Sequence, residues 1–501
     1  MPGPSSRSLL YTDGYKFSMA EAGFPLRREA FYYAHRKGGW AFLPVDVEDF
    51  VRDNLPISTP EDWAFLDAHG YFQGGAFRQA IAQHDRVKTV GLPRGSWFYD
   101  REPVFYVDGP SALPSWLEPC ALQLNFRIQV ATAALLNPDV LAEKVARVTC
   151  EAERAIVLET LDYVGVAAPS IQVDVEGYAA AVLARARRLV DILGDADRAF
   201  EVGMRAVSGM EQHRIALTAI RAAGIKRTSN VGLAAELDMI PVGTMGHEHI
   251  QRYGDDYQAF VAMRDKFPGF VFYLPDTFDT VASGAPSALS AMQAEPARNS
   301  GIRFDSEHGI RGHYLYAVNR ARELGMVPYL GLESGWNEAR TVEFEELRKL
   351  VDWPRERQGY GYGGYLVKPP WPHFGRDDVS AVWKLCFSLC GRMKFGDEPG
   401  SAKASIPGRP ISWRPHLGMA GYTGPFGYVA QQGEEWEPPV PATMLSGSTD
   451  IPPPTRFTVT EIKSLMHRAR PIAYSPQTLA LIDRCTGERE AGITRALTRR
   501  S

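Results

Sequence analysis

The sequence predicts an α/β fold: a parallel β/α barrel flanked by β-rich segments from both ends of the chain. Three observations support this prediction. Short apolar strands alternate with helical stretches from about residue 200 to 370, the first 120 residues are rich in aromatics and short turns, and strand-like patterns return after residue 370. Because the chain has 501 residues, it is expected to contain more than one domain.

The composition narrows the class of protein. Hydrophobic residues make up 45% and charged residues 23%, which is typical of globular proteins with a large core. The net charge of −4 gives no indication of a nucleic-acid or anionic-membrane partner. No apolar run has the length of a signal peptide or membrane helix, so we expect a cytoplasmic protein. The five cysteines are few and scattered, which favours reduced thiols, and we expect Cys386 and Cys390 to be core residues.

We expect a β-rich domain over residues 1–125, with some helix such as "PEDWAFLDAHG". Helical spacing dominates from about 121 to 200. The stretch "GYAAAVLARARRLVDILGD" is amphipathic, and Gly194 is a candidate C-cap.

The barrel is predicted over residues 126–374 from a regular repeat. Candidate strands are "DMIPVG", "FVFYLPD", "GIRFDS", "VPYLGLES" and "GYGYGGYLV", separated by helical stretches such as "HYLYAVNRARELG" and "VEFEELRKLV". The residues at the strand ends are Gly243, Asp276, Asp305, Ser334 and Gly363, and the gaps between them are 33, 29, 29 and 29 residues. This is the length of a β-α unit, and an open doubly wound sheet is the alternative to a barrel.

After residue 370 the pattern changes. "KPPWPHFGRDD" is a break, and "VWKLCFSLCGRMKFG" reads as strands that return to the first β-rich domain, which about 375–430 would complete. Residues 431–501 form a C-terminal extension. We expect much of it to be loop, because residues 430–455 are rich in proline and polar residues, and we expect a frayed tail at "GITRALTRRS".

Ligands of parallel β/α folds bind at the carboxyl ends of the strands, which makes those ends the candidate site. Asp276 and Asp305 could hold Mg²⁺ through water or bind sugar hydroxyls, although helix N-capping explains both equally well. Arg303 lies two residues before Asp305 and would share its face of the strand. The glycines in "GYGYGGYLV" would let backbone N–H groups approach a phosphate. Arg205 could bind an anion or be solvated.

The stretch "GTMGHEHI" carries His247 and His249 around Glu248. The downstream spacing is helical, and in a helix the two histidines point about 200° apart, which disfavours a shared metal. A histidine at a strand-to-helix corner suits a general base or a covalent nucleophile, while a structural histidine remains possible.

Several segments, in this order, resemble the nicotinate and nicotinamide phosphoribosyltransferase family. They are "YTDGYKFSM", "FYYAHRKGG", "EVGMRAVSG", "TSNVGLAAELDMIPVGTMGHE", "DTFDT", "GIRFDS", "GYGGYLV" and "MKFGDEPGSAKASIPGR". The resemblance runs from about residue 9 to 410. It implies an irregular, TIM-like α/β barrel beside a β-rich domain from both chain ends, and homodimers in which one subunit's N-terminal segment enters the other's active site.

The resemblance also implies a reaction. Nicotinate and phosphoribosyl pyrophosphate would give nicotinate mononucleotide and pyrophosphate, with Mg²⁺ carried mainly by substrate phosphates and with ATP hydrolysed through a phosphohistidine. By this resemblance His247 is the phosphate acceptor, Asp276 and Asp305 lie near the ribose and metal, and Tyr15 stacks on the pyridine ring. The further substrate-binding residues implied are Asp13, Arg36, Lys37, Arg205, Ser229, Arg303, Ser334, Gly363 and Gly364.

One local feature favours the acid substrate. Amide-using members resemble "GTD" where this chain has Thr228-Ser229-Asn230. Ser229 would not repel a carboxylate, and Arg303 could pair with it.

Three residues depart from the family pattern. Val202 replaces an aromatic residue that sandwiches the ring, Glu307 replaces a glycine, and Trp336 replaces an acid near the ribose, with Glu333 or Asn337 as the candidate to compensate. These departures keep two alternatives open: a nicotinamide-preferring enzyme, and a catalytically weak relative that binds pyridine nucleotides or phosphoribosyl pyrophosphate. His247 and His249 keep a third open, an unrelated metal-dependent barrel hydrolase.

Overall fold

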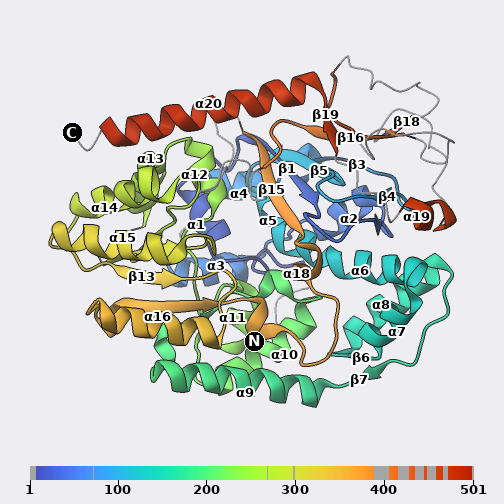
Figure 1. The fold of residues 1–501 in the computed structure, drawn as a ribbon, viewed down its shortest axis with the longest axis horizontal. Helices are drawn as coiled ribbons and strands as arrows, with labels where there is room; N and C mark the ends of the chain where they lie inside the picture. The colour runs from blue at the N-terminus through green and yellow to red at the C-terminus, as the bar shows by residue number, and fades with distance from the viewer. Residues whose placement is uncertain are drawn as a thin grey trace.

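A computed structural model gives the fold, which combines a curled parallel sheet with smaller antiparallel sheets (Figure 1). The structure describes residues 7–71, 73–267, 269–296, 299–388, 405–415, 428–434, 445–447, 459–465 and 472–498. Cys390 and most of the segment 393–409 lie outside these ranges.

The largest sheet has seven strands in the order β10-β9-β8-β14-β13-β12-β11, and all neighbouring strands in it are parallel. The strands are β8 (Ala199–Glu201), β9 (Arg227–Thr228), β10 (Ile240–Pro241), β11 (Val271–Tyr273), β12 (Ser300–Phe304), β13 (Tyr329–Leu332) and β14 (Gln358–Tyr362). The five strands expected from the sequence, β10 to β14, are confirmed. Each ends within three residues of the predicted end position.

The strand order distinguishes the two predicted α/β folds. The last strand, β14, pairs with the first, β8, so that spatial order follows chain order around the sheet. An open doubly wound sheet would reverse its order in the middle. The described strands therefore form a curled sheet in barrel order, open between β10 and β11. At this break the Thr244 hydroxyl donates a 2.9 Å hydrogen bond to the Phe272 carbonyl.

Helices cover the outside of this sheet, and the expected alternation of strand and helix is observed. Amphipathic α9 begins after the Asp174 cap and ends at Gly194, whose φ of 60° is the left-handed conformation expected of this C-cap. The helices of this part are α9 (Val175–Leu193), α10 (Met210–Ala222), α11 (Val231–Leu237), α12 (His247–Tyr253), α13 (Asp256–Lys266), α14 (Ala285–Gln293), α15 (Ile310–Glu323), α16 (Glu338–Leu350) and α17 (Gly364–Val367), with single turns η2 (Ala196–Arg198), η3 (Met204–Ala206), π-helical η4 (Thr280–Gly284) and η5 (Arg355–Arg357).

The chain ends meet in a second sheet, ordered β15-β1-β5-β3, whose neighbours are antiparallel. Its strands are β1 (Arg28–Ala34), β3 (Lys88–Gly91), β5 (Phe105–Pro110) and β15 (Val382–Ser388). Strand β15 thus lies beside β1 although about 350 residues separate them in sequence. The buried rings of Phe31, Phe105 and Trp383 pack between this sheet and its helices.

Helices and short strands surround this second sheet. The helices are α1 (Tyr15–Glu21), α2 (Val47–Asn54), α3 (Pro60–Ala68), α4 (Gly75–Ile81), η1 (His84–Arg86), α5 (Ala112–Trp116), α6 (Glu118–Leu136), α7 (Pro138–Val145), α8 (Glu151–Val164) and α18 (Arg376–Val379). The paired short strands are β2 (Ala41–Phe42) with β4 (Trp97–Phe98), and β6 (Arg147–Val148) with β7 (Gln172–Val173).

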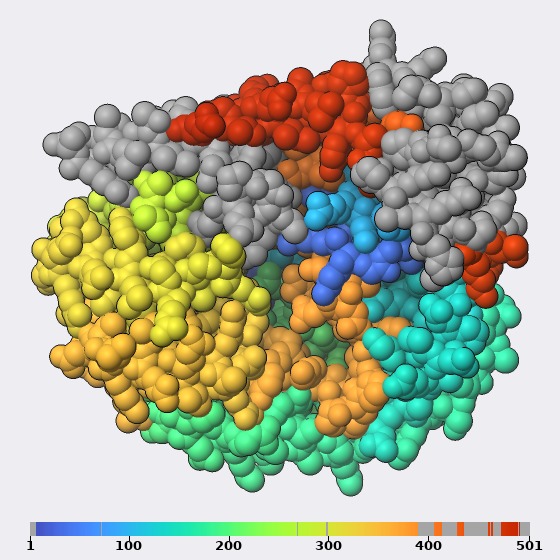
Figure 2. Space-filling view, viewed as in Figure 1, coloured from blue at the N-terminus to red at the C-terminus, as the bar shows by residue number. Residues whose placement is uncertain are grey.

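The C-terminal part adds β16 (Pro410–Pro415), β17 (Tyr428–Gln431), β18 (Leu445–Gly447), α19 (Val459–Leu465), β19 (Ala473–Tyr474) and α20 (Pro476–Thr498). Helix α20 runs along the top of the view in Figures 1 and 2 and contacts η4. The prediction of a frayed tail is wrong as far as Thr498, because α20 continues to that residue. No helix among the described residues is long and apolar enough to cross a membrane.

Candidate active site

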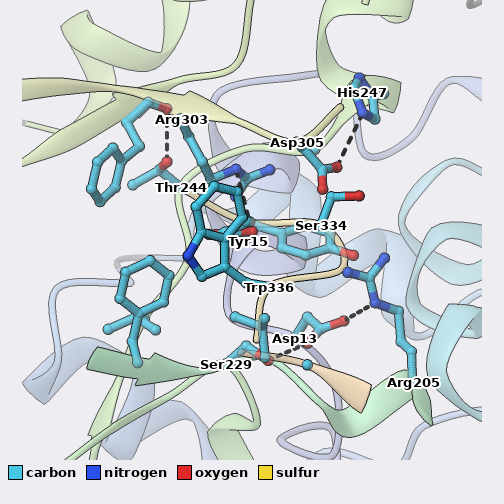
Figure 3. Close-up of a pocket in the computed structure, with 18 of the residues that line it drawn as sticks. Asp13, Tyr15, Arg205, Ser229, Thr244, His247, Arg303, Asp305, Ser334 and Trp336 are labelled. Carbon is cyan, nitrogen blue, oxygen red and sulfur yellow. Dashed lines mark hydrogen bonds and ion pairs between the residues drawn. The ribbon is translucent and has the colours of Figure 1, made fainter. Parts of the chain in front are cut away.

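A cavity of about 1490 Å³ extends from the carboxyl ends of the parallel strands, where the predicted residues lie, to residues at the amino ends such as Asn299 and Arg357. Its walls come from distant parts of the chain. Figure 3 shows the N-terminal segment with Asp13 and Tyr15 beside residues that follow the strands, and β15 also contributes to the lining. The sequence-predicted residues that line it are Asp13, Tyr15, Arg36, Lys37, Arg205, Ser229, His247, Arg303, Asp305, Ser334, Gly363 and Gly364. Asp276 is the exception, since it lies behind His247 and is buried.

His247 is the first residue of α12, and two acids lie near one of its ring nitrogens. Its Nε2 lies 3.3 Å from Asp305 Oδ2 and 3.8 Å from Asp276 Oδ1. Its Nδ1 lies 3.1 Å from the Thr277 hydroxyl. The acids favour a proton on Nε2, so that Nδ1 keeps the lone pair and accepts from Thr277. An imidazole whose ring is oriented by acids at one nitrogen is suited to act as a nucleophile through the other nitrogen.

The two acids differ in environment. Asp276 is 2% exposed and accepts a hydrogen bond from the Ser306 hydroxyl, whereas the Asp305 side chain is one third exposed and faces the cavity. Asp305 is therefore the acid that a substrate can meet directly. Asp276 does not line the cavity, and its carboxylate lies next to His247, which does.

The N-terminal segment lies in the cavity of its own chain. The Ser229 hydroxyl donates a 2.6 Å hydrogen bond to Asp13 Oδ1, and Arg205 Nε lies 3.5 Å from Asp13 Oδ2 (Figure 3). Burial raises the pKa of Asp13, while Arg205 and the Ser229 hydrogen bond oppose that rise. Delivery of Asp13 and Tyr15 from a second subunit, implied by the family resemblance, is not required by this geometry.

A buried cluster of ion pairs fixes the N-terminal segment. This cluster was not predicted from the sequence. Lys16 Nζ lies 2.7 Å from Glu118 Oε2 and 2.6 Å from Glu248 Oε1. The Tyr15 hydroxyl donates to Glu118 at 2.9 Å, and Arg205 Nη1 lies 3.2 Å from the same carboxylate. Burial alone would raise the pKa of Glu118, but Lys16 and Arg205 outweigh it and hold that pKa far below its usual range. These contacts fix the position of Tyr15, and Cζ of Arg205 lies 5.8 Å from the centre of the Tyr15 ring.

Arg303 and Glu333 meet in the barrel wall that lines the cavity. Arg303 Nη2 donates to the Met245 carbonyl at 2.8 Å, and its Nε lies 3.8 Å from Glu333 Oε2. Both side chains are largely buried. Burial raises the pKa of Glu333 to about 7, with Arg303 lowering it and Asp305 raising it. Of the two residues considered as compensation for Trp336, Glu333 lines the cavity, whereas Asn337 caps α16 by accepting from Arg340 N at 3.0 Å.

Cations from the second sheet line the other side of the cavity. Arg36 and Lys37 follow β1, and both of their backbone N–H groups donate to the Val379 carbonyl. Arg376 and Lys384 line the same cavity and were not predicted from the sequence. Burial, and then the charge of Arg205, lowers the pKa of Arg376. Such a concentration of positive charge suits a polyphosphate.

The glycine-rich turn after β14 forms another part of the cavity wall. Gly363 precedes the single-turn helix α17, and Gly364 is its first residue. A Cβ on Gly364 would lie 3.3 Å from an Asp377 oxygen, so the backbone is close to α18 here. Ser334, after β13, has a left-handed φ of 72°, and its carbonyl accepts from Arg340 Nη1 at 3.1 Å.

His247 and His249 do not share a ligand. His249 is fully buried, and its Nε2 donates to the Ala259 carbonyl at 2.9 Å. Burial lowers the pKa of His249 to about 4. Glu248 is committed to Lys16, Ser115 and Arg252. In the part of the chain that the structure describes, no three His, Cys, Asp or Glu side chains are grouped to hold a metal ion.

The three departures from the family pattern occupy different places. Val202 lines the cavity, and its N–H donates to the Tyr362 carbonyl at 2.9 Å. Trp336 is 1% exposed and packs on Phe344 with ring centres 5.0 Å apart, so that it is part of the barrel core as well as of the cavity wall. Glu307 is exposed at the cavity, over Gly335.

Comparison with known proteins gives one relative by sequence. The chain is 26% identical over 253 residues to a Bacillus subtilis protein named nicotinate phosphoribosyltransferase, and the match spans 48% of each chain, about half the length of that relative. No protein-family model matches the chain.

Solved structures agree in fold. A Saccharomyces cerevisiae structure described as a nicotinate phosphoribosyltransferase has a TM-score of 0.59 at 16% identity and covers 81% of this chain and 96% of its own. Nicotinate phosphoribosyltransferases from Porphyromonas gingivalis and Vibrio cholerae both have TM-scores of 0.55, at 18% and 16% identity, covering 79% and 80% of this chain and 95% and 90% of their own. The resemblance predicted from the sequence is confirmed.

Proposed function

We propose that this chain is a nicotinate phosphoribosyltransferase, which joins nicotinate to phosphoribosyl pyrophosphate and releases pyrophosphate. The observation that carries the proposal is the meeting of an acid, Asp305, with Tyr15 and a group of cations around one cavity. The similarity to the Bacillus subtilis relative supports the same reaction.

In this reaction the pyridine nitrogen bonds to the anomeric carbon of the ribose while the bond from that carbon to the pyrophosphate oxygen breaks. Positive charge develops on the ribose in the transition state, and negative charge on the departing pyrophosphate. Asp305 would stabilise the first, and Arg36, Lys37 and Arg376 the second, because fixed charges act strongly in a partly dry cavity. The backbone at Gly363 and Gly364 would take the 5′-phosphate, and Ser334 would contact the ribose.

Mg²⁺ is part of the proposal as a charge carried by the substrate. Mg²⁺ prefers oxygen ligands and usually keeps substrate phosphates and water in its coordination shell. A cavity in which several cations lie near the exposed acid Asp305 fits a metal that arrives on pyrophosphate. When bound, Mg²⁺ would neutralise charge on the leaving group.

We assign ATP coupling to His247. Once the Thr277 hydroxyl turns away from Nδ1, the lone pair on Nδ1 would attack the γ-phosphorus of ATP, the bond to the bridging oxygen would break, and ADP would leave, giving a phosphohistidine that water later hydrolyses. Asp305 and Asp276 support this assignment because they hold Nε2 and stabilise its proton.

Arg303 favours nicotinate as the pyridine. The guanidinium of Arg303 could pair with a carboxylate, and the ring would stack on Tyr15. One contact favours nicotinamide as a second candidate: the Asp13 carboxylate beside Ser229 supplies an acceptor that would suit an amide NH₂ group. The homodimer implied by the resemblance also stays a proposal.

The decisive test uses the purified full chain with Mg²⁺ and phosphoribosyl pyrophosphate, with and without ATP. Nicotinate and nicotinamide are supplied separately and in competition, and the mononucleotides are separated by chromatography. We expect nicotinate mononucleotide as the main product, formed faster when ATP is hydrolysed. Consumption of neither pyridine would overturn the proposed function, and a preference for the amide would favour the second candidate.

A further inference from the structure

Glu333 presents a chemical conflict with the proposed substrate. It lies at the end of β13 and lines the cavity, and its Oε2 is 3.8 Å from Nε of Arg303, the cation proposed to bind the pyridine carboxylate. Nε of Arg303 is buried and has no hydrogen-bond partner among the described residues. The same guanidinium donates a hydrogen bond to the Met245 carbonyl through Nη2. The free side of this guanidinium therefore faces either Glu333 or a ligand.

The surrounding charges decide whether Glu333 and a second carboxylate can coexist. The groups that act on Glu333 are Arg303 on β12, Asp305 after β12, Arg205 on η3 and Asp13 of the N-terminal segment. Two are cations and two are acids. With Glu333 ionised, a nicotinate carboxylate would be a second negative charge at the one guanidinium of Arg303, in a buried place.

A proton on Glu333 removes this conflict. The neutral carboxyl no longer competes for Arg303, and its O–H can donate a hydrogen bond to the incoming carboxylate. The local environment already favours the proton: burial and Asp305 raise the pKa of Glu333 and Arg303 lowers it, and the resulting pKa is about 7. A neutral carboxamide brings no charge and needs no such proton.

We propose that Glu333 is a specificity-determining residue that takes up one proton when nicotinate binds to Arg303, and that this proton separates the acid substrate from the amide. The inference rests on the proposed function. Nicotinate should bind best where Glu333 is protonated, below about pH 7, and its apparent affinity should fall as the pH rises above that value. The affinity for nicotinamide should not follow this change.

The test is the pH dependence of KM for nicotinate and for nicotinamide between pH 6 and 9, in the wild type and in Glu333→Gln. Glutamine has the shape of the protonated side chain and cannot ionise. In the wild type we expect KM for nicotinate to rise roughly tenfold per pH unit above pH 7, with kcat changing much less. In Glu333→Gln the rise should be less than about twofold. Glu356→Gln is the control, because this exposed carboxylate lies in η5 at the amino end of β14, away from Arg303 and Glu333 at the other end of the strands, and it should keep the wild-type profile.

A second measurement needs no variant. Calorimetric titration of the wild type with nicotinate at pH 8, in two buffers of different ionisation enthalpy, should show uptake of about one proton per nicotinate and none with nicotinamide. A protein that transfers phosphoribose to neither pyridine would contradict the proposed function. A protein that is active, but whose nicotinate profile is the same in Glu333→Gln or whose binding takes up no proton, would overturn the role of Glu333 alone.

Discussion

At the scale of single residues, the two ring nitrogens of His247 have different neighbours, which makes its role testable. Replacement by alanine should lower nicotinate-dependent ATP hydrolysis by roughly 100-fold or more, because the nucleophile is lost. Transfer without ATP should persist, because Asp305 and the phosphate-binding cations remain. Measuring ADP and nicotinate mononucleotide in the same reaction separates the two effects.

The control for this substitution is His84→Ala, outside the cavity, in η1. It should leave both products at wild-type levels. ATP hydrolysis that continues unchanged in His247→Ala would rule out the phosphohistidine.

Site residues could be predicted from the sequence where they directly follow a predicted strand. Residues that the fold brings to the cavity from distant parts of the sequence could not be predicted. His247, Asp305 and Gly363 mark strand ends. Glu118 and Arg376 are ordinary charged residues in the sequence, and only folding brings them to the cavity, through α6 and α18.

Ser229 shows a subtler limit of sequence reasoning. From the sequence, Ser229 is interpreted as a neutral residue near the position at which amide-using members have an acid. In the structure the Asp13 carboxylate, more than 200 residues earlier, lies 2.6 Å from its hydroxyl and restores a negative charge there.

At the scale of elements, π-helical η4 packs against the loop that carries Asp276. A Cβ on Gly284 would lie 1.9 Å from the Pro275 carbonyl oxygen, so Gly284→Ala must push this loop away. We expect a loss of stability of about 1–3 kcal/mol and lower activity, since Asp276 would shift relative to His247. Thermal unfolding and initial rates measure the two effects.

Gly312→Ala is the matched control in α15, where a Cβ would meet nothing within 4 Å. Alanine should stabilise this helix by about 0.5–1 kcal/mol without changing the rate. If Gly284→Ala behaved like Gly312→Ala, the close packing of η4 on the loop would be disproved.

Asp256 begins α13 and accepts a hydrogen bond from Ser283 of η4. Burial raises its pKa to about 7 from 3.8. The folded state therefore binds more protons than the unfolded state between these values, and this residue makes stability fall as the pH rises from about 4 to 7. Above pH 7 the full cost is present. Asp256→Asn should thus raise the unfolding temperature at pH 8 and have little effect near pH 4.

The cost that this substitution relieves is at most about 4 kcal/mol. Asp46→Asn is the control, because Asp46 caps α2 at an exposed position and asparagine caps equally well. An Asp256→Asn effect that is the same at both pH values would show that Asp256 is not forced to ionise in the folded protein.

Element prediction succeeded where apolar runs were long enough to show a period. Strands β11 to β14 were all found from such runs. Strands β8 and β9 were missed because they have three and two residues and contain Glu201, Arg227 and Thr228. Burial of Glu201 explains its place in a strand: its carboxylate accepts from the Thr228 hydroxyl at 2.6 Å and lies 3.0 Å from His213 Nε2. Such pairing cannot be read from local sequence.

At the scale of the whole molecule, both chain ends contribute to one cavity. The sheet that joins β1 to β15 brings Arg36 and Lys384 to the strand ends of the barrel. The N-terminal segment is held by Lys16 between two buried acids, and removing one partner of such a pair is costly. The cavity is therefore a product of the complete fold, although its acids and glycines belong to the barrel.

The contacts of the N-terminal segment predict that each chain builds its own active site. Asp13 reaches Ser229 and Arg205 within the chain. Two inactive variants, Asp13→Ala and Asp305→Ala, should therefore not rescue each other when they are mixed or co-expressed. If the segment instead crossed to a partner subunit, half of the dimers in an equal mixture would be mixed, each with one intact site, and roughly a quarter of the wild-type activity would return. The assay is nicotinate mononucleotide formation after co-expression, with each variant's unfolding temperature measured alone to show that it folds. Recovery to about a quarter would contradict a site built within one chain, and activity no higher than that of the separate variants would support it whatever the oligomeric state.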